Sequence, residues 1–256
     1  MIIATTQILM AENNHTDIRG GHDWLENRGM NLRAIICVDD FDRELQKAWD
    51  QAGISTHPND RLVLLGMAGS SLWHFLKENN RLGDDRFDEF STETSLEVSR
   101  LFWGDQSPRI IYPGNTLIPL QQIGRSLGWG APSPLGLDIN PQYGPWFAYR
   151  AAFLTQSQLP VTNAFRIRHS PCDSCVEKPC ISNCPASALR SDALPDLNGC
   201  VSRRIEDQTG CGLVCRSRLS CPVGREWCYS EEHLNYHGER SLYSLARWVN
   251  RDDKIL

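Results

Sequence analysis

The part of the chain that decides its organisation reads CDSCVEKPCISNCP over residues 172–185 and CGLVCRSRLSCP over residues 211–222. A further cysteine, Cys200, lies between the two runs. Each run closes on a Cys-Pro pair, and proline fixes the backbone φ angle and lacks an amide N–H. The chain is therefore expected to turn away after the last cysteine of each run.

Thiolates grouped in short loops are the usual ligands of iron–sulfur clusters. In bacterial two-cluster ferredoxins, the cysteine of each Cys-Pro pair ligates the cluster that the other run holds. The same rule predicts two [4Fe–4S] clusters here, with crossed ligands. The first set is Cys172, Cys175, Cys180 and Cys221, and the second is Cys184, Cys200, Cys211 and Cys215. Four residues separate Cys175 from Cys180, so this loop bulges but can still close around one face of a cube.

Cysteines have two other common uses, as ligands of structural zinc and as disulfides. Structural zinc sites also take four thiolates, but zinc ribbons pair two Cys-x2-Cys hooks and this chain has one. A disulfide scaffold is typical of short secreted chains, whereas this one has 256 residues and no visible signal peptide. Iron–sulfur clusters therefore remain the prediction, with zinc as the main alternative.

Length and composition limit the size of the core, the class of partner and the cellular compartment. The chain has a hydrophobic share of 41%, which is enough for a substantial core, and a formal net charge of -5. That charge argues against nucleic acid or an acidic membrane as a partner. No stretch is long and apolar enough to span a bilayer. Because thiolate ligands require a reducing compartment, we expect a cytoplasmic protein.

Before the cysteines, the hydrophobic pattern predicts alternating strands and helices. Arg150 falls inside an apolar strand, where a charge needs an acidic partner or a bound anion. Residues 82–90 are charged and irregular, which indicates an exposed loop. The expected strands are 32–38, 61–66, 135–139 and 146–154, and the expected helices follow Asp40, begin near Ser71, span 117–127 and span 241–249.

The segment from Pro134 to Arg150, PLGLDINPQYGPWFAYR, resembles the hairpin of CblC-type cobalamin-processing proteins. Asn140 stands where that family has histidine. The resemblance implies a nitroreductase-like antiparallel sheet and cobalamin as a further cofactor. It also implies that Tyr143, Trp146 and Arg150 contact a corrinoid or a thiol ligand such as glutathione. No catalytic residue is identified.

The cysteine region resembles the double-cluster domain of epoxyqueuosine reductases and reductive dehalogenases. Bacterial ferredoxin-like proteins that combine both segments resemble the chain most. The acidic catalytic residue of many epoxyqueuosine reductases has no match here. The implied fold class is α+β, with a CblC-like sheet flanked by helices and then a small ferredoxin-like domain. The expected boundaries are 1–168, 169–230 and a tail with a helix over 231–256.

These features lead to one main functional prediction and two alternatives. The main one is a cobalamin-linked oxidoreductase, in which a ferredoxin or flavodoxin donates electrons through the clusters to a corrinoid or small-molecule substrate. The first alternative is an electron carrier with no chemistry of its own. The second is an RNA-modifying enzyme similar to epoxyqueuosine reductase.

Overall fold

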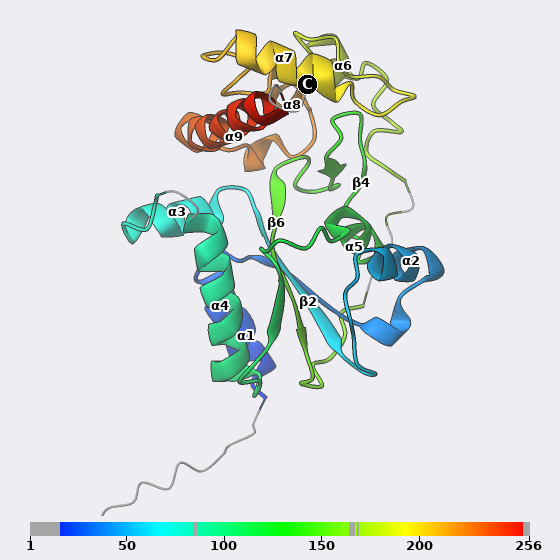
Figure 1. The fold of residues 1–256 in the computed structure, drawn as a ribbon, viewed down its shortest axis with the longest axis vertical. Coiled ribbons are helices and arrows are strands. Elements are labelled where there is room, and N and C mark those ends of the chain that lie inside the picture. Colours follow the sequence, from blue (N-terminus) through cyan, green and yellow to red (C-terminus); the bar gives the residue numbers. More distant parts are fainter. Residues whose placement is uncertain (1–15, 84–85, 164–166, 168, 253–256) are drawn as a thin grey trace, which may run out of the picture.

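The computed structural model describes residues 16–83, 86–163, 167 and 169–252. A sheet with helices on both faces forms one part, which we call the sheet domain, and residues 169–230 form a cap above it (Figure 1). The four strands of the sheet are antiparallel neighbours in the order β1-β2-β6-β3. They span β1 (Leu32–Cys37), β2 (Arg61–Ala68), β6 (Phe147–Thr155) and β3 (Arg109–Tyr112). The expected α+β class is confirmed.

The central strand β2 separates two apolar cores. Its side chains alternate, so that Val63, Leu65 and Met67 pack into one core while Leu62 and Leu64 pack into the other. Helices cover both faces (Figure 1). They are α1 (Ile18–Glu26), α3 (Ser71–Glu78) and α4 (Arg86–Phe102) on one face, and α2 (Arg43–Gln51) and α5 (Leu120–Ser126) on the other.

Helix α4 corrects one prediction, because the expected exposed loop over 82–90 is wrong from Arg86 onward. The buried face of α4 carries hydroxyl side chains at helical spacing: Ser91, Ser95 and Ser99. Each hydroxyl donates to the carbonyl four residues earlier, at 2.6 to 2.9 Å. These bonds satisfy the buried hydroxyls, and the small side chains let the helix lie close to the sheet. Apolar side chains occupy only three positions of this buried face, Phe87, Phe90 and Val98, so apolar periodicity gives a weak signal for the helix.

The predicted strands at 32–38 and 61–66 are confirmed. The expected hairpin strand over 135–139 is shorter in the structure: β5 (Asp138–Ile139) pairs with β4 (Ala131–Pro132) in a separate two-stranded sheet. The predicted tail helix is much longer, since α9 spans Glu231–Asp252. None of the helices in the described part of the chain combines the length and apolar character that crossing a membrane requires.

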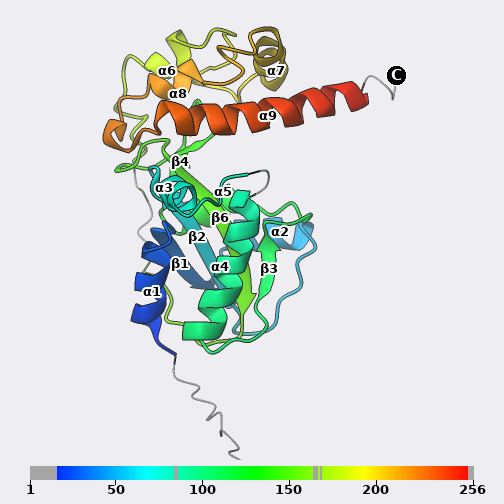
Figure 2. The ribbon, with the colours of Figure 1, turned by 90° about the vertical axis from the view of Figure 1, so that its left-hand side faces the viewer.

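The cap consists of loops and short helices. Helix α9 lies lengthwise between the cap and the sheet domain, and its C-terminal end projects beyond both (Figure 2). No residue of α7 is fully buried. The cap helices are α6 (Pro179–Ser182), α7 (Leu197–Glu206), α8 (Arg216–Leu219) and the 3-10 turn Arg225–Trp227.

Candidate iron–sulfur centres and the junction beneath them

The first predicted set of cysteines comes together in the structure. All four side chains line one small hollow, which proline and apolar side chains close. Helices α6 and α8 pack against each other, and this contact brings the second run of the cap to the first. The set therefore contains three thiols from the first run and one from the Cys-Pro pair of the second. Its members are Cys172, Cys175, Cys180 and Cys221.

The second set also comes together, with the crossing in the opposite direction. The Cys211 thiol lies in the electrostatic field of three other thiols, including that of Cys184 from the first run. The Cys200 thiol is coupled to Cys184 and Cys215 in the same way. The N-terminal run thus contributes its Cys-Pro thiol to the group that the later cysteines form. The members of this set are Cys184, Cys200, Cys211 and Cys215.

Both sets fit a multi-iron cluster. Burial, followed by the proximity of the other thiols, raises the pKa of Cys180 and Cys211, because neighbouring thiolates repel one another. A bound cationic metal removes that repulsion and deprotonates its ligands. Among the described residues, no three His, Cys, Asp or Glu side chains form a group suited to a single metal ion.

Hydrogen bonds already prepare one thiol for the charged state. Burial of Cys184 acts to raise its pKa. Hydrogen bonds from the backbone of Ala186 and Ala188 and from the Ser217 side chain outweigh that effect, so the pKa of Cys184 is lowered. Donors directed at cluster sulfurs raise reduction potentials. This ligand position is therefore built for a thiolate.

The cap meets the sheet domain through backbone packing. Gly144 (φ 57°) and Gly224 (φ 66°) both adopt left-handed conformations. A Cβ atom on Gly144 would overlap the Val223 carbonyl, and one on Gly224 would overlap the backbone of Tyr143. The tip of the 140–144 turn therefore lies directly against the chain that follows Cys221. Only glycine permits this approach.

Arg218 connects the two parts a second time. Arg218 follows Cys215 and precedes Cys221 in the sequence. Its guanidinium donates to the carbonyl of Pro145 at 2.6 and 3.2 Å. It also stacks over Trp146 at 4.5 Å and over Tyr229 at 4.9 Å. Trp146, which was predicted to contact a cofactor, is buried beneath this arginine. The contact holds the cap on the N-terminal end of β6.

A buried carboxylate supports the floor of the first cysteine set. Asp138 accepts hydrogen bonds from Arg125 Nε at 2.8 Å and from the Tyr149 hydroxyl at 2.9 Å. Burial raises the pKa of Asp138, although both hydrogen bonds oppose the shift. The next residue, Ile139, lines the hollow of the cysteines. The three side chains join α5, β5 and β6 beneath the cap.

The three residues predicted to contact a cofactor do not form one group. Tyr143 packs edge-on against Trp227 at 4.8 Å, in the core that α2 and α5 cover. Trp146 belongs to the opposite core. Arg150 points toward α4, with its guanidinium over Phe87 at 4.9 Å. A role in binding a corrinoid or a thiol therefore stays a prediction for each of them.

Two cysteines lie outside both sets. Cys37 is buried at the end of β1, as its place in an apolar strand predicted. Cys228 is partly buried, and its thiol lies 3.5 Å from the carbonyl oxygen of Tyr229. Neither residue lines the hollow of the first cysteine set.

Sequence reasoning gave no role to a histidine pair on α9. His233 and His237 lie one turn apart, and their Nε2 atoms are 3.0 Å from each other. The His233 Nδ1 atom lies 3.0 Å from the Ser70 hydroxyl. The i,i+4 spacing of the two histidines is the signal that could have revealed them, since it puts both rings on one helix face. That signal was hidden because the tail was expected to become helical only at Ser241.

Comparison with known proteins identifies the fold. No protein-family model matches the chain, and no curated protein matches its sequence. An epoxyqueuosine reductase solved with an epoxyqueuosine-modified tRNA-Tyr stem loop superposes with a TM-score of 0.55, at 13% identity, over 84% of this chain and 68% of that chain. The Bacillus subtilis epoxyqueuosine reductase gives 0.54 at 15% identity, over 84% of this chain and 66% of that one. The chain thus has the fold of these enzymes and spans about two thirds of their length.

The comparison corrects the expectation about partners. The expectation that nucleic acid is not a partner is wrong at the level of the fold, because a similar protein was solved with a tRNA stem loop. Net charge did not predict this partner class, because it is a sum over the whole chain and does not describe the charge of one surface. The cap itself carries a group of arginines: Arg203, Arg204, Arg216, Arg218 and Arg225. The cobalamin-linked prediction gains no support from these neighbours, and the RNA-modifying alternative fits them better.

Proposed function

We propose that this chain is an iron–sulfur reductase that acts on an oxidised nucleoside in RNA, with epoxyqueuosine in transfer RNA as the first substrate to test. The observation that carries the proposal is the pair of crossed four-cysteine sets. They lie on a fold shared with epoxyqueuosine reductases. Neither feature alone separates a reductase from an electron carrier; their combination favours the reductase.

The residues of the chain have defined tasks under this proposal. The eight cysteines hold two [4Fe–4S] clusters, which supply one-electron transfer when bound. Arg218 and the two junction glycines fix the cap on the end of β6. The exposed arginines of the cap, Arg216 and Arg225, offer a docking surface for an acidic donor such as ferredoxin or flavodoxin. Removal of an epoxide oxygen as water consumes two electrons and two protons, so the site also needs proton donors.

The decisive experiment uses protein purified and reconstituted without oxygen, a strong chemical reductant, and a stem loop that contains epoxyqueuosine. Mass spectrometry of the digested RNA should show the loss of one oxygen atom in an enzyme-dependent way. A matched stem loop that contains guanosine should stay unchanged. If the modified RNA stays unchanged while the clusters reduce a redox dye, the chain is an electron carrier and the proposal fails.

Metal analysis tests the cofactor assignment separately. About eight irons per chain, two cubanes' worth, are expected. Zinc in their place would exclude the proposal. An absorbance spectrum recorded before and after addition of cob(II)alamin tests the remaining prediction, that a corrinoid binds near Tyr143, Trp146 or Arg150.

The crossing of the ligands has its own test. Cys184→Ala should damage the cluster of Cys200, Cys211 and Cys215, whereas Cys221→Ala should damage the other. Electron paramagnetic resonance of the reduced variants distinguishes the two clusters. Cys228→Ala is the matched control and should leave both signals intact. Loss of the cluster nearest in sequence in each variant would contradict the assignment.

A further inference from the structure

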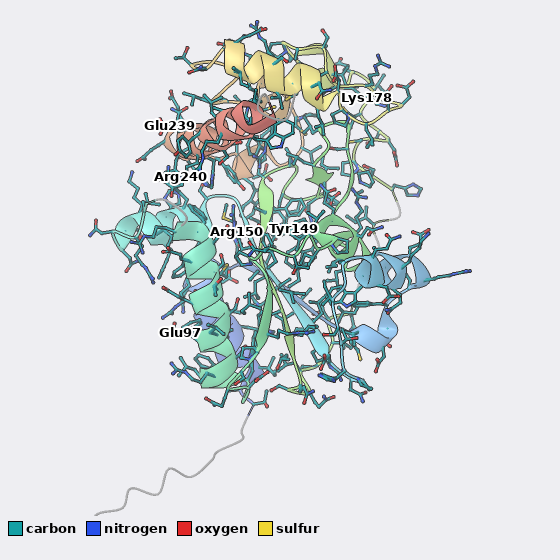
Figure 3. The ribbon with its side chains drawn as sticks, in the orientation of Figure 1. Glu97, Tyr149, Arg150, Lys178, Glu239 and Arg240 are labelled. Carbon is teal, nitrogen blue, oxygen red and sulfur yellow. The ribbon has the colours of Figure 1, made fainter. Side chains whose placement is uncertain are left out.

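Arg150 occupies a special position in β6. Leu65 pairs with Ala151 and Gly66 pairs with Tyr149, so Arg150 is the additional residue of a β-bulge. A bulge turns one side chain out of the regular alternation, and such bulges often lie beside active sites. Figure 3 shows Arg150 and Tyr149 leaving β6 in opposite directions, with Arg150 on the side of α4. Its Nε atom is buried and has no hydrogen-bond partner among the described residues.

The histidine pair of α9 reaches the same place. The rings of His237 and Phe87 lie 4.9 Å apart, and the Arg150 guanidinium lies over the same Phe87 ring. His237 is half-buried, whereas His233 behind it has an exposed fraction of 0% and stacks between Trp73 and Tyr229. The short contacts from His237 to His233 and on to Ser70 form a chain that leads from the junction into the protein.

Among the described residues, the charges around the pair are mainly positive. The groups that surround the two rings are Arg150 on β6, Arg218 on α8, Arg240 and Tyr236 on α9, His74 on α3, Tyr229, and Asp88 of α4, which acts with Arg150 on the Tyr112 hydroxyl. Burial, followed by the neighbouring positive charges, lowers the pKa of His237 to about 3. A metal cation is disfavoured here and an anion is favoured.

We infer that Arg150 and His237 bind a phosphate group of the RNA substrate at the junction of β6, α4 and α9. The inference rests on the proposed function. The guanidinium supplies a fixed positive charge and a free donor, and the imidazole supplies a second donor. His233 and Ser70 are positioning residues, because they set the ring orientation and the proton position of His237. Nucleic acid is the ligand class that carries such anions along its whole backbone.

The geometry also couples binding to proton uptake. An anion held between Arg150 and His237 offsets the positive charges that now keep the imidazole neutral. The pKa of His237 therefore rises from about 3 when the anion binds. Uptake is expected at pH values between the free and the raised pKa, so the titrations below are repeated from pH 5.5 to pH 8, and uptake should decrease as the pH rises. The same proton is then available to a reaction that consumes protons.

Calorimetry with inorganic sulfate tests the site. Sulfate has the shape and charge of phosphate and does not titrate at pH 5.5. Titrations of the cluster-loaded protein in two buffers with different ionisation enthalpies should show proton uptake. Arg150→Gln should weaken sulfate binding roughly tenfold or more, and His237→Asn should abolish the uptake. Arg100→Gln and His57→Asn, both at exposed sites, are the matched controls. Binding and uptake unchanged in both site variants would overturn the inference.

An RNA experiment separates this inference from the proposed function. Binding of the epoxyqueuosine stem loop is measured over a range of salt concentrations. Arg150→Gln should reduce the slope of log K against log salt by about one, and Arg100→Gln should not. If Arg150→Gln keeps the wild-type slope, the inference is overturned while the RNA function stands. If the wild-type protein binds no RNA, the proposed function falls, and with it the RNA ligand.

Discussion

The sheet domain and the cap are stabilised in different ways. The sheet domain buries large side chains on both faces of β2, among them Trp49, Trp103 and Phe153. The cap buries few apolar side chains, namely Cys180, Ala188, Cys221 and Tyr229, and leaves Val176 and Leu194 with exposed fractions of 93% and 90%. Apolar burial therefore accounts for one part and not for the other. Under the proposed function, the bound clusters and the junction with the sheet domain supply the stabilisation that the cap lacks.

Loss of the clusters should have the largest effect. In protein treated with a chelator and an oxidant, the cap should unfold while the sheet domain keeps its structure, because only the cap depends on bound metal. Limited proteolysis followed by mass spectrometry should find cuts within 169–230. Equal cutting throughout residues 16–163 would show that the two parts are not independent in this way.

Phe153→Ala should destabilise the sheet domain and leave the cap unaffected. Its ring has no exposed surface in the core that α1, α3 and α4 share, so its removal should cost about 3–5 kcal/mol of stability. Denaturant unfolding, followed by circular dichroism, measures this cost. The control Leu194→Ala in the cap should change stability by about 0.5 kcal/mol or less. A comparable loss in the two variants would show that the cap has an apolar core after all.

Gly224→Ala tests the junction between the two parts. The added Cβ must overlap the backbone of Tyr143, so we expect a loss of about 2–4 kcal/mol and weaker retention of iron. Gly53→Ala is the matched control, because Gly53 also has a positive φ but has no atom near the added Cβ. It should show only the strain of the left-handed conformation, about 1–2 kcal/mol. Equal losses would show that contact at the junction contributes nothing.

The histidine pair should produce a smaller, pH-dependent effect. The pKa of His233 is lowered from 6.5 to about 2, mainly by burial, so the unfolded chain binds a proton that the folded chain does not. The contribution of the neutral His233 to stability is thus fully present above pH 6.5. Below that pH it is lost, and the free energy of unfolding decreases by up to about 1.4 kcal/mol per pH unit. Unfolding curves from pH 8 to pH 5 measure this slope. His233→Leu should reduce this slope, and the remainder is due to His237, whose pKa is also lowered, to about 3. An unchanged slope would assign the acid sensitivity to other groups.

Much of the site followed from cysteine spacing. The two groups of thiols that the structure brings together are the two sets that the crossing rule predicts, because a Cys-Pro pair constrains the chain locally. Arg150 was recognised as a charge in an apolar strand, but its direction depends on a bulge relative to β2. Helix α4 was missed because its buried hydroxyls are satisfied within the helix. The roles of Gly144 and Gly224 depend on a contact between residues 80 positions apart.

The sequence by itself determined the β1 and β2 strands, the α+β class and the grouping of the cysteines. Each of these depends on short-range periodicity or spacing, which the chain carries wherever it folds. Only the tertiary structure decided that Arg150, His237 and Ser70 meet at one junction. These residues come from β6, α9 and the start of α3, and no local pattern links them. Packing of α9 beneath the cap brings them together, because its histidine side chains are buried against α3, α4 and Tyr229.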